Sequence, residues 1–168
     1  PTNISFSAPI TPDKIFVLEH FGRSGTGLLH SLIDNHSEVI TLPSIYFSQF
    51  FDSSIWDKIT INGWNGLADN FIKEYPVLFD ARAPKPVKSK TGQEIKHVGL
   101  KEGMANVGNN RDEYLSVDKA LFHKSLVHQL SHYESIDACG FFKLIHVAFE
   151  EALNNSGKKS SIFYHIHN

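Results

Sequence analysis

Apolar residues fall along this chain in short runs that predict alternating strands and helices. Residues 14–21 (KIFVLEHF) predict a strand, and its continuous apolar run IFVL is typical of a strand buried on both faces of a parallel sheet. Residues 161–167 (SIFYHIH) predict a second buried strand, and residues 39–42 predict a short third one. Because helical patterns separate these runs, we expect a three-layer α/β/α fold with a parallel sheet.

Two helices flank these strands in the predicted fold. Residues 26–35 predict a short helix, and residues 141–152 carry the clearest helical stripe of the chain. The packed sides predicted for the two helices are, respectively, Leu28, Leu29, Leu32 and Ile33, and Phe141, Ile145, Ala148, Phe149 and Ala152. Gly157 is expected just beyond the end of the second helix, as its C′ residue.

The middle of the chain has a different composition. Aromatic side chains are frequent in residues 44–75, where two helices are expected around the turn Asn62-Gly63; these side chains either pack in the core or line an acceptor pocket. Residues 80–110 are rich in proline, lysine and glycine, and we interpret them as an insertion or a mobile loop that contains a hairpin. Ser116 is expected to cap a helix that extends to about Tyr133.

Length and charge limit the class of protein. The 168 residues suffice for one domain, and the net charge of −2 does not indicate a nucleic-acid-binding surface. No apolar run reaches the ~18 residues that a membrane-spanning helix needs. Cys139 is the single cysteine, which fits a reducing compartment and leads us to expect a cytoplasmic protein. The first residue is proline rather than methionine, so we expect the chain to be part of a longer protein.

A glycine-rich segment between the first strand and the first helix carries the clearest chemistry. Residues 22–27 read GRSGTG, and their glycines allow a sharp turn and a close approach to a ligand. The N–H groups of such a loop converge with the unpaired N–H groups at the start of a helix, which creates an anion site for a phosphate. The alternative interpretation is a strand–turn–helix junction that binds nothing.

The glycine spacing satisfies only the first half of the Walker A pattern. The second half requires Lys and then Ser or Thr, which contact phosphates and Mg²⁺, but this chain has Leu28 and Leu29 there. An ATP- or GTP-hydrolysing enzyme is therefore disfavoured. The cation lies instead at the front of the loop, at Arg23, and its guanidinium matches the oxygen geometry of phosphate or sulfate.

The stretch FGRSGTGLLHSLIDNHSEV, residues 21–39, resembles the 5′-phosphosulfate-binding loop and first helix of the sulfotransferases, which use PAPS (3′-phosphoadenosine 5′-phosphosulfate). That loop typically has a basic residue followed by Ser-Gly-Thr-Thr and Leu-Leu, with His-Pro at the end of the helix. The positions that match are Arg23, Ser24, Gly25, Thr26, Leu28, Leu29 and His36. Gly27 replaces the usual second Thr, and Ser37 replaces the usual Pro.

This resemblance implies a P-loop NTPase-like topology and a transferase that moves a sulfuryl group from PAPS to an acceptor hydroxyl or amine without a metal. Arg23 would stabilise the leaving 5′-phosphate, and the loop from Gly22 to Gly27 would hold it through backbone N–H groups and the Thr26 hydroxyl. The resemblance also implies PAP (adenosine 3′,5′-bisphosphate) as the product nucleotide, and a small molecule or a glycan as the acceptor.

The C-terminal segment IFYHIHN shows a second, shorter resemblance, to the strand that leads into the 3′-phosphate-binding motif of the same family. His167 falls at the position of the usual Arg, although neutral imidazole is a weaker phosphate anchor than guanidinium. Because the chain stops at the next residue, we expect the domain to be truncated at its C-terminus. Two rival functions stay open: a P-loop kinase-like phosphotransferase, and a non-catalytic relative that binds a phosphorylated ligand.

The general base and any metal site have to be sought among ten histidines. His20 ranks first as a base because it is closest to the loop, although a structural or surface role is the alternative for it. Less favoured candidates for the base are His146, His165 and His167. His128 and His132 have a spacing that suits metal binding, but no further ligand pattern completes the pair, so no metal site is predicted.

Overall fold

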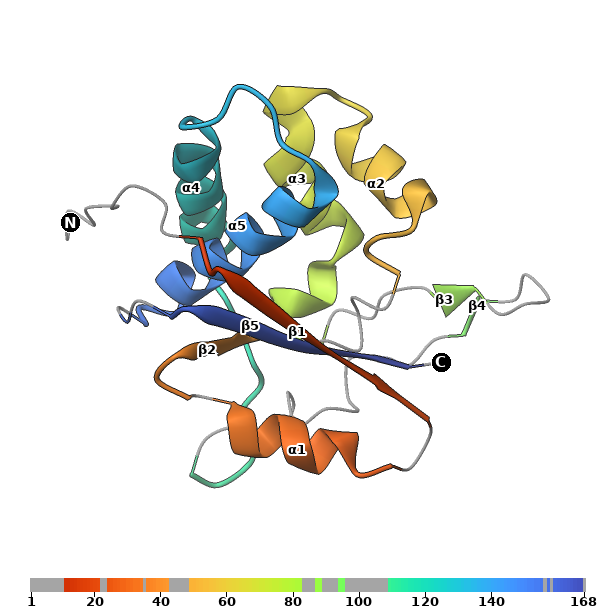
Figure 1. The fold of residues 1–168 in the computed structure, drawn as a ribbon, viewed down its shortest axis with the longest axis vertical. Helices are drawn as coiled ribbons and strands as arrows, with labels where there is room; N and C mark the ends of the chain where they lie inside the picture. The colour runs from red at the N-terminus through yellow and green to blue at the C-terminus, as the bar shows by residue number, and fades with distance from the viewer. Residues whose placement is uncertain are drawn as a thin grey trace.

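The computed structural model describes residues 11–21, 24–34, 36–42, 49–82, 87–88, 94–95, 109–155, 157 and 159–167. Helices lie on both sides of a small parallel sheet, so the chain has an α/β fold (Figure 1). In chain order the elements are β1 (Lys14–His20), α1 (Thr26–Ile33), β2 (Val39–Thr41), α2 (Ser53–Thr60), α3 (Leu67–Glu74), β3 (Val87–Lys88), β4 (Glu94–Ile95), α4 (Lys119–Leu130), α5 (Ala138–Ala152) and β5 (Ser161–His167), with 3-10 turns at Trp64–Gly66 and Pro76–Leu78.

The sheet has the strand order β1-β5-β2, so the last described strand lies in its centre. β5 runs parallel to β1 in a register that extends from the pair Lys14–Ser161 to the pair His20–His167. β2 is also parallel to β5, and Val39 pairs with Ser161. The strands predicted at 39–42 and 161–167 are confirmed, and the carboxyl ends of β1 and β5 meet at one edge of the sheet.

β5 is buried on both faces, as predicted. Ile162 and Tyr164 face the side covered by α5, and Phe163 and His165 face the side covered by α1. All four side chains are at most 8% exposed. This central strand therefore contributes to both layers of side chains.

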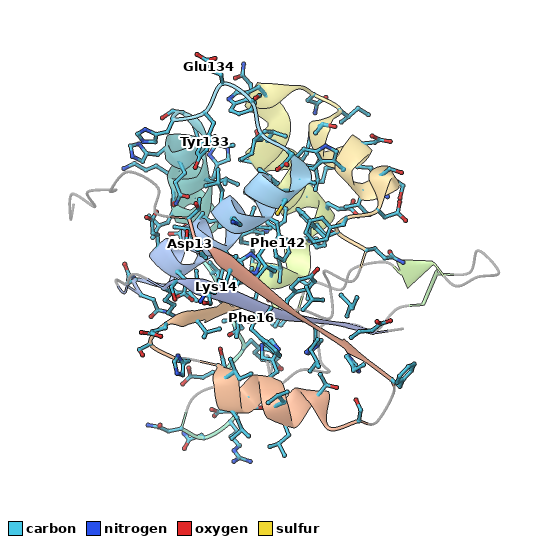
Figure 2. The ribbon with its side chains drawn as sticks, viewed as in Figure 1. Asp13, Lys14, Phe16, Tyr133, Glu134 and Phe142 are labelled. Carbon is cyan, nitrogen blue, oxygen red and sulfur yellow. The ribbon has the colours of Figure 1, made fainter. Side chains whose placement is uncertain are left out.

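The same prediction is wrong for β1. Phe16 and Val17 are 52% and 50% exposed, although they lie in the middle of the apolar run. Within the described residues β1 pairs only with β5, so it forms an edge of the sheet and both of its faces are partly uncovered. Phe16, on the α1 side, and Phe142, on the α5 side, mark the two faces of the sheet in Figure 2.

The main core lies between the sheet and helices α2 to α5. The stripe predicted for the last helix is confirmed, because all five of its residues are buried. Phe122 of α4 is fully buried and contacts the rings of Phe71, Phe79 and Phe149. Among the described aromatic residues of segment 44–75, Phe50, Phe71 and Tyr75 are fully buried, which supports core packing rather than an acceptor pocket.

Two helix ends differ from their predicted positions. α4 is capped by Asp118, whose carboxylate accepts hydrogen bonds from the N–H groups of Ala120 and Leu121 at 2.8 and 3.0 Å. Ser116, the predicted cap, instead forms a β-bridge with Asp80. α5 ends at Ala152, before Gly157, and the left-handed residue that follows it is Asn154, with φ of 58°.

The described part of segment 80–110 contains a short antiparallel pair. β3 and β4 pair through Val87–Ile95 and Lys88–Glu94, so the predicted hairpin is confirmed at these four positions. The remaining part of the predicted loop lies largely outside the described residues. In the part of the chain that the structure describes, no helix is long and apolar enough to cross a membrane.

Candidate functional site

The predicted strand–loop–helix unit is present at the carboxyl edge of the sheet. β1 ends at His20, and α1 begins at Thr26 (Figure 1). Gly22 and Arg23 lie outside the described residues, so the structure describes the second half of the glycine loop and not its cation. The site is therefore built from Ser24 onward.

Gly25 is the N-cap of α1 and has a left-handed backbone conformation, with φ of 78° and ψ of 10°. This region strongly favours glycine, because a Cβ would approach the backbone too closely. The carbonyl of Gly25 accepts hydrogen bonds from the N–H groups of Leu28 and Leu29, at 3.0 and 3.2 Å. By helix geometry, the N–H groups of Thr26 and Gly27 are outside the helical ladder and are suited to an external anion.

The two hydroxyl groups of the loop contact each other. Ser24 Oγ lies 2.8 Å from Thr26 Oγ1, and Thr26 is only 7% exposed. This contact joins the two side chains that flank Gly25, and no side chain caps α1. A phosphate bound at this helix end would have the Ser24 and Thr26 hydroxyls beside the first-turn N–H groups.

Gly27 has a different role from Gly25. A Cβ built at Gly27 meets no atom within 4 Å, and its φ is not in the left-handed region. The backbone therefore does not require glycine here. The threonine that the sulfotransferase pattern has at this position would also fit sterically.

Three of the four residues on the predicted packed side of α1 are exposed, and the fourth, Ile33, is half-buried. Leu28, Leu29 and Leu32 are 68%, 41% and 73% exposed. Two polar residues contact the sheet instead: His30 contacts the rings of Phe163 and His165, and Asp34, the C-cap residue, accepts a hydrogen bond from Thr41 Oγ1. Thr26, four residues before His30, is buried. The helix therefore meets the sheet through a polar stripe.

Three histidine rings from three elements meet behind the loop. His165 of β5 is 3% exposed and contacts His20 of β1 and His30 of α1, with ring-centroid distances of 5.0 and 5.1 Å. Nδ1 of His30 lies 3.4 Å from Nδ1 of His165. The sequence analysis did not single out His30; the signal was its spacing of four residues from both Thr26 and Asp34.

His20 lies near the loop, as expected, but its Nε2 is not turned toward solvent. Its Nδ1 is 3.2 Å from the carbonyl oxygen of Phe21, and its Nε2 is buried. For His20 to act as a base, its ring has to turn. The other candidate, His167, pairs with His20 across the sheet, so both parts of the predicted nucleotide site lie at the same edge; the side chain of His167 is outside the described set.

The remaining histidine candidates lie away from this edge. His146 is fully buried in α5, and burial lowers its pKa to about 4. His128 of α4 contacts His132, two residues after the end of the helix, at a ring-centroid distance of 5.2 Å. Across the described ranges, no group of three or more His, Cys, Asp or Glu side chains is arranged to hold a metal ion.

Comparisons with protein-family models, with curated proteins and with solved structures found no match to this chain. The features of this chain that indicate a function are therefore the left-handed Gly25 at the start of α1 and the GRSGTG motif.

Proposed function

We propose that this chain is the donor-binding part of a PAPS-dependent sulfotransferase with a P-loop NTPase-like topology. The observation that supports this most directly is Gly25, which caps α1 in the left-handed conformation in the connection between β1 and α1. It leaves the first-turn N–H groups facing the loop, where the 5′-phosphosulfate of the donor would bind. The basic-Ser-Gly-Thr sequence then selects sulfotransferase among the anion-binding loops.

The proposed reaction is an in-line displacement at sulfur. The acceptor oxygen or nitrogen forms a new bond to sulfur while the bond between sulfur and the bridging phosphate oxygen breaks, and PAP leaves. Arg23 and the loop N–H groups stabilise the negative charge that develops on the leaving phosphate. A base takes the acceptor proton, and His20 is the candidate nearest to the loop.

The kinase-like alternative has weaker support. Leu28 and Leu29 occupy the positions at which a Walker A loop has Lys and Ser or Thr, and both side chains are more than 40% exposed without carrying a polar group. Neither side chain can bind a phosphate or Mg²⁺. The proposed site therefore does not require a metal.

Calorimetry on the full chain with PAP and with ATP, each with and without Mg²⁺, tests the proposal. We expect metal-independent binding of PAP. Metal-dependent binding of ATP would instead support the kinase-like alternative, and absence of binding in all four titrations would support the loop as a turn or a binder of some other phosphorylated ligand.

Arg23→Ala is the variant that isolates the proposed cation. Charge-assisted hydrogen bonds contribute about 1.5–3 kcal/mol, so we expect PAP affinity to fall by about 10- to 150-fold. Arg111→Ala is the matched control, because Arg111 is an exposed arginine in a different part of the chain. Equal PAP affinity in the two variants would exclude Arg23 from the site.

A further inference from the structure

α1 carries the first-turn N–H groups of the proposed site, so whatever holds α1 against the sheet also positions those groups. The exposed leucines of α1 do not supply this contact. At the centre of the polar stripe, His30 contacts the rings of Phe163 and His165. The bond between His30 and His165 joins the helix to the central strand across 135 residues of sequence.

The hydrogen bond between His30 and His165 is compatible with only some protonation states of the two rings. Both partners use Nδ1, so one ring must donate the proton and the other must accept it. When both rings carry two protons, neither Nδ1 can accept, and two positive charges face each other. The bond therefore exists only while at least one of the two rings is neutral.

Two further ionisable groups lie close to this pair. His20 of β1 contacts the ring of His165 and adds a third imidazole to the same side of the sheet. Asp34 lies one helical turn beyond His30 and accepts a hydrogen bond from Thr41 of β2. Protonation of His20 adds to the repulsion at His165, and the Asp34 carboxylate partly offsets it.

We propose that His30 and His165 are positioning residues of the nucleotide site: their hydrogen bond holds α1, and with it the Thr26 and Gly27 N–H groups, against β5. Acidification that protonates both rings releases the helix and weakens nucleotide binding. The nucleotide part of this inference rests on the proposed function. The docking of α1 does not, and it is measured separately.

Two substitutions at His30 separate the bond from simple packing. In His30→Asn the side-chain amide replaces Nδ1, so it can bond to His165 but does not titrate. In His30→Leu the apolar volume is kept and the bond is lost. His132→Asn, in the turn after α4, is the control for removing an exposed histidine away from the site.

Hydrogen exchange of the α1 amides in the full chain is the first measurement, as a series of pH values from about 7.5 downward for as long as the chain stays folded. After correction for intrinsic exchange, we expect about tenfold loss of α1 protection on acidification of the wild type and of His132→Asn. In His30→Asn we expect no such loss. In His30→Leu we expect about fivefold lower protection at about pH 7.5.

PAP affinity, measured by calorimetry on the same proteins, is the second measurement. The phosphates of PAP titrate near pH 6, so the relevant quantity is the acid-induced weakening in the wild type beyond that in His30→Asn. We expect an excess of about tenfold. If the wild type and His30→Leu show equal α1 protection, the His30–His165 hydrogen bond does not hold α1 against β5. Normal docking behaviour with no excess pH effect on PAP overturns the positioning role, and absence of PAP binding to the wild type overturns the proposed function alone.

Discussion

Gly25 and Gly27 lie two residues apart in the loop, and alanine at each position is expected to have opposite effects. At Gly25 the backbone has φ of 78°, and a left-handed conformation costs an alanine about 1–2 kcal/mol. No atom lies within 4 Å of the new Cβ, so no steric clash adds to this cost. Gly27 lies in the first turn of α1, also with open space around it, where alanine is favoured by about 0.5–1 kcal/mol.

Thermal unfolding of the two variants measures these free energies. For a domain of this size 1 kcal/mol corresponds to about 2–4 °C in Tm, so Gly25→Ala is expected to lower Tm by about 2–8 °C. Gly27→Ala is expected to raise it by about 1–4 °C. The reasoning is refuted if Gly25→Ala is as stable as the wild type, or if both variants lose the same stability.

Three further predictions concern the core and the helix ends. Phe122→Ala is expected to cost about 3–5 kcal/mol in urea unfolding, because Phe122 is fully buried among aromatic rings; a loss below 1 kcal/mol would contradict this packing. Burial lowers the pKa of His146 to about 4, so the unfolded chain takes up a proton first and stability should fall by up to about 3 kcal/mol as pH drops from about 6.5 to 4. His146→Leu should remove that part of the pH dependence, and an unchanged slope would show that other groups cause it. Asp118→Ala should lose about 1 kcal/mol by thermal unfolding, and Ser116→Ala less; the reverse order would restore Ser116 as the cap.

Sequence patterns predicted where helices and strands lie better than they predicted which neighbours cover each element. The buried stripe of α5 and the strand β5 follow from local periodicity, because both are enclosed on the sides that the pattern indicates. The apolar run of β1 is compatible with burial on both faces, but it does not determine how many strands pair with β1. Its position at the edge of the described sheet depends on the pairing of distant segments.

The candidate site was predicted only in part for a related reason. Gly25 and the start of α1 were found because turn chemistry is local. The docking side of α1 was not, because periodicity assigns leucines to the inside, whereas this helix contacts the sheet through His30 and Asp34. A contact such as His30–His165 joins two segments 135 residues apart, and the sequence of one segment does not indicate that it contacts the other.

The central position of β5 has a consequence for synthesis of the protein. β1 and β2 both pair with β5, which leaves the ribosome about 120 residues after Thr41. Until then neither early strand has the partner that it has in the described sheet, and the sheet edge beside the glycine-rich loop is incomplete. Such long-range pairing is slow to form and leaves strands open to wrong partners, so the nascent chain is expected to depend on chaperones until β5 inserts.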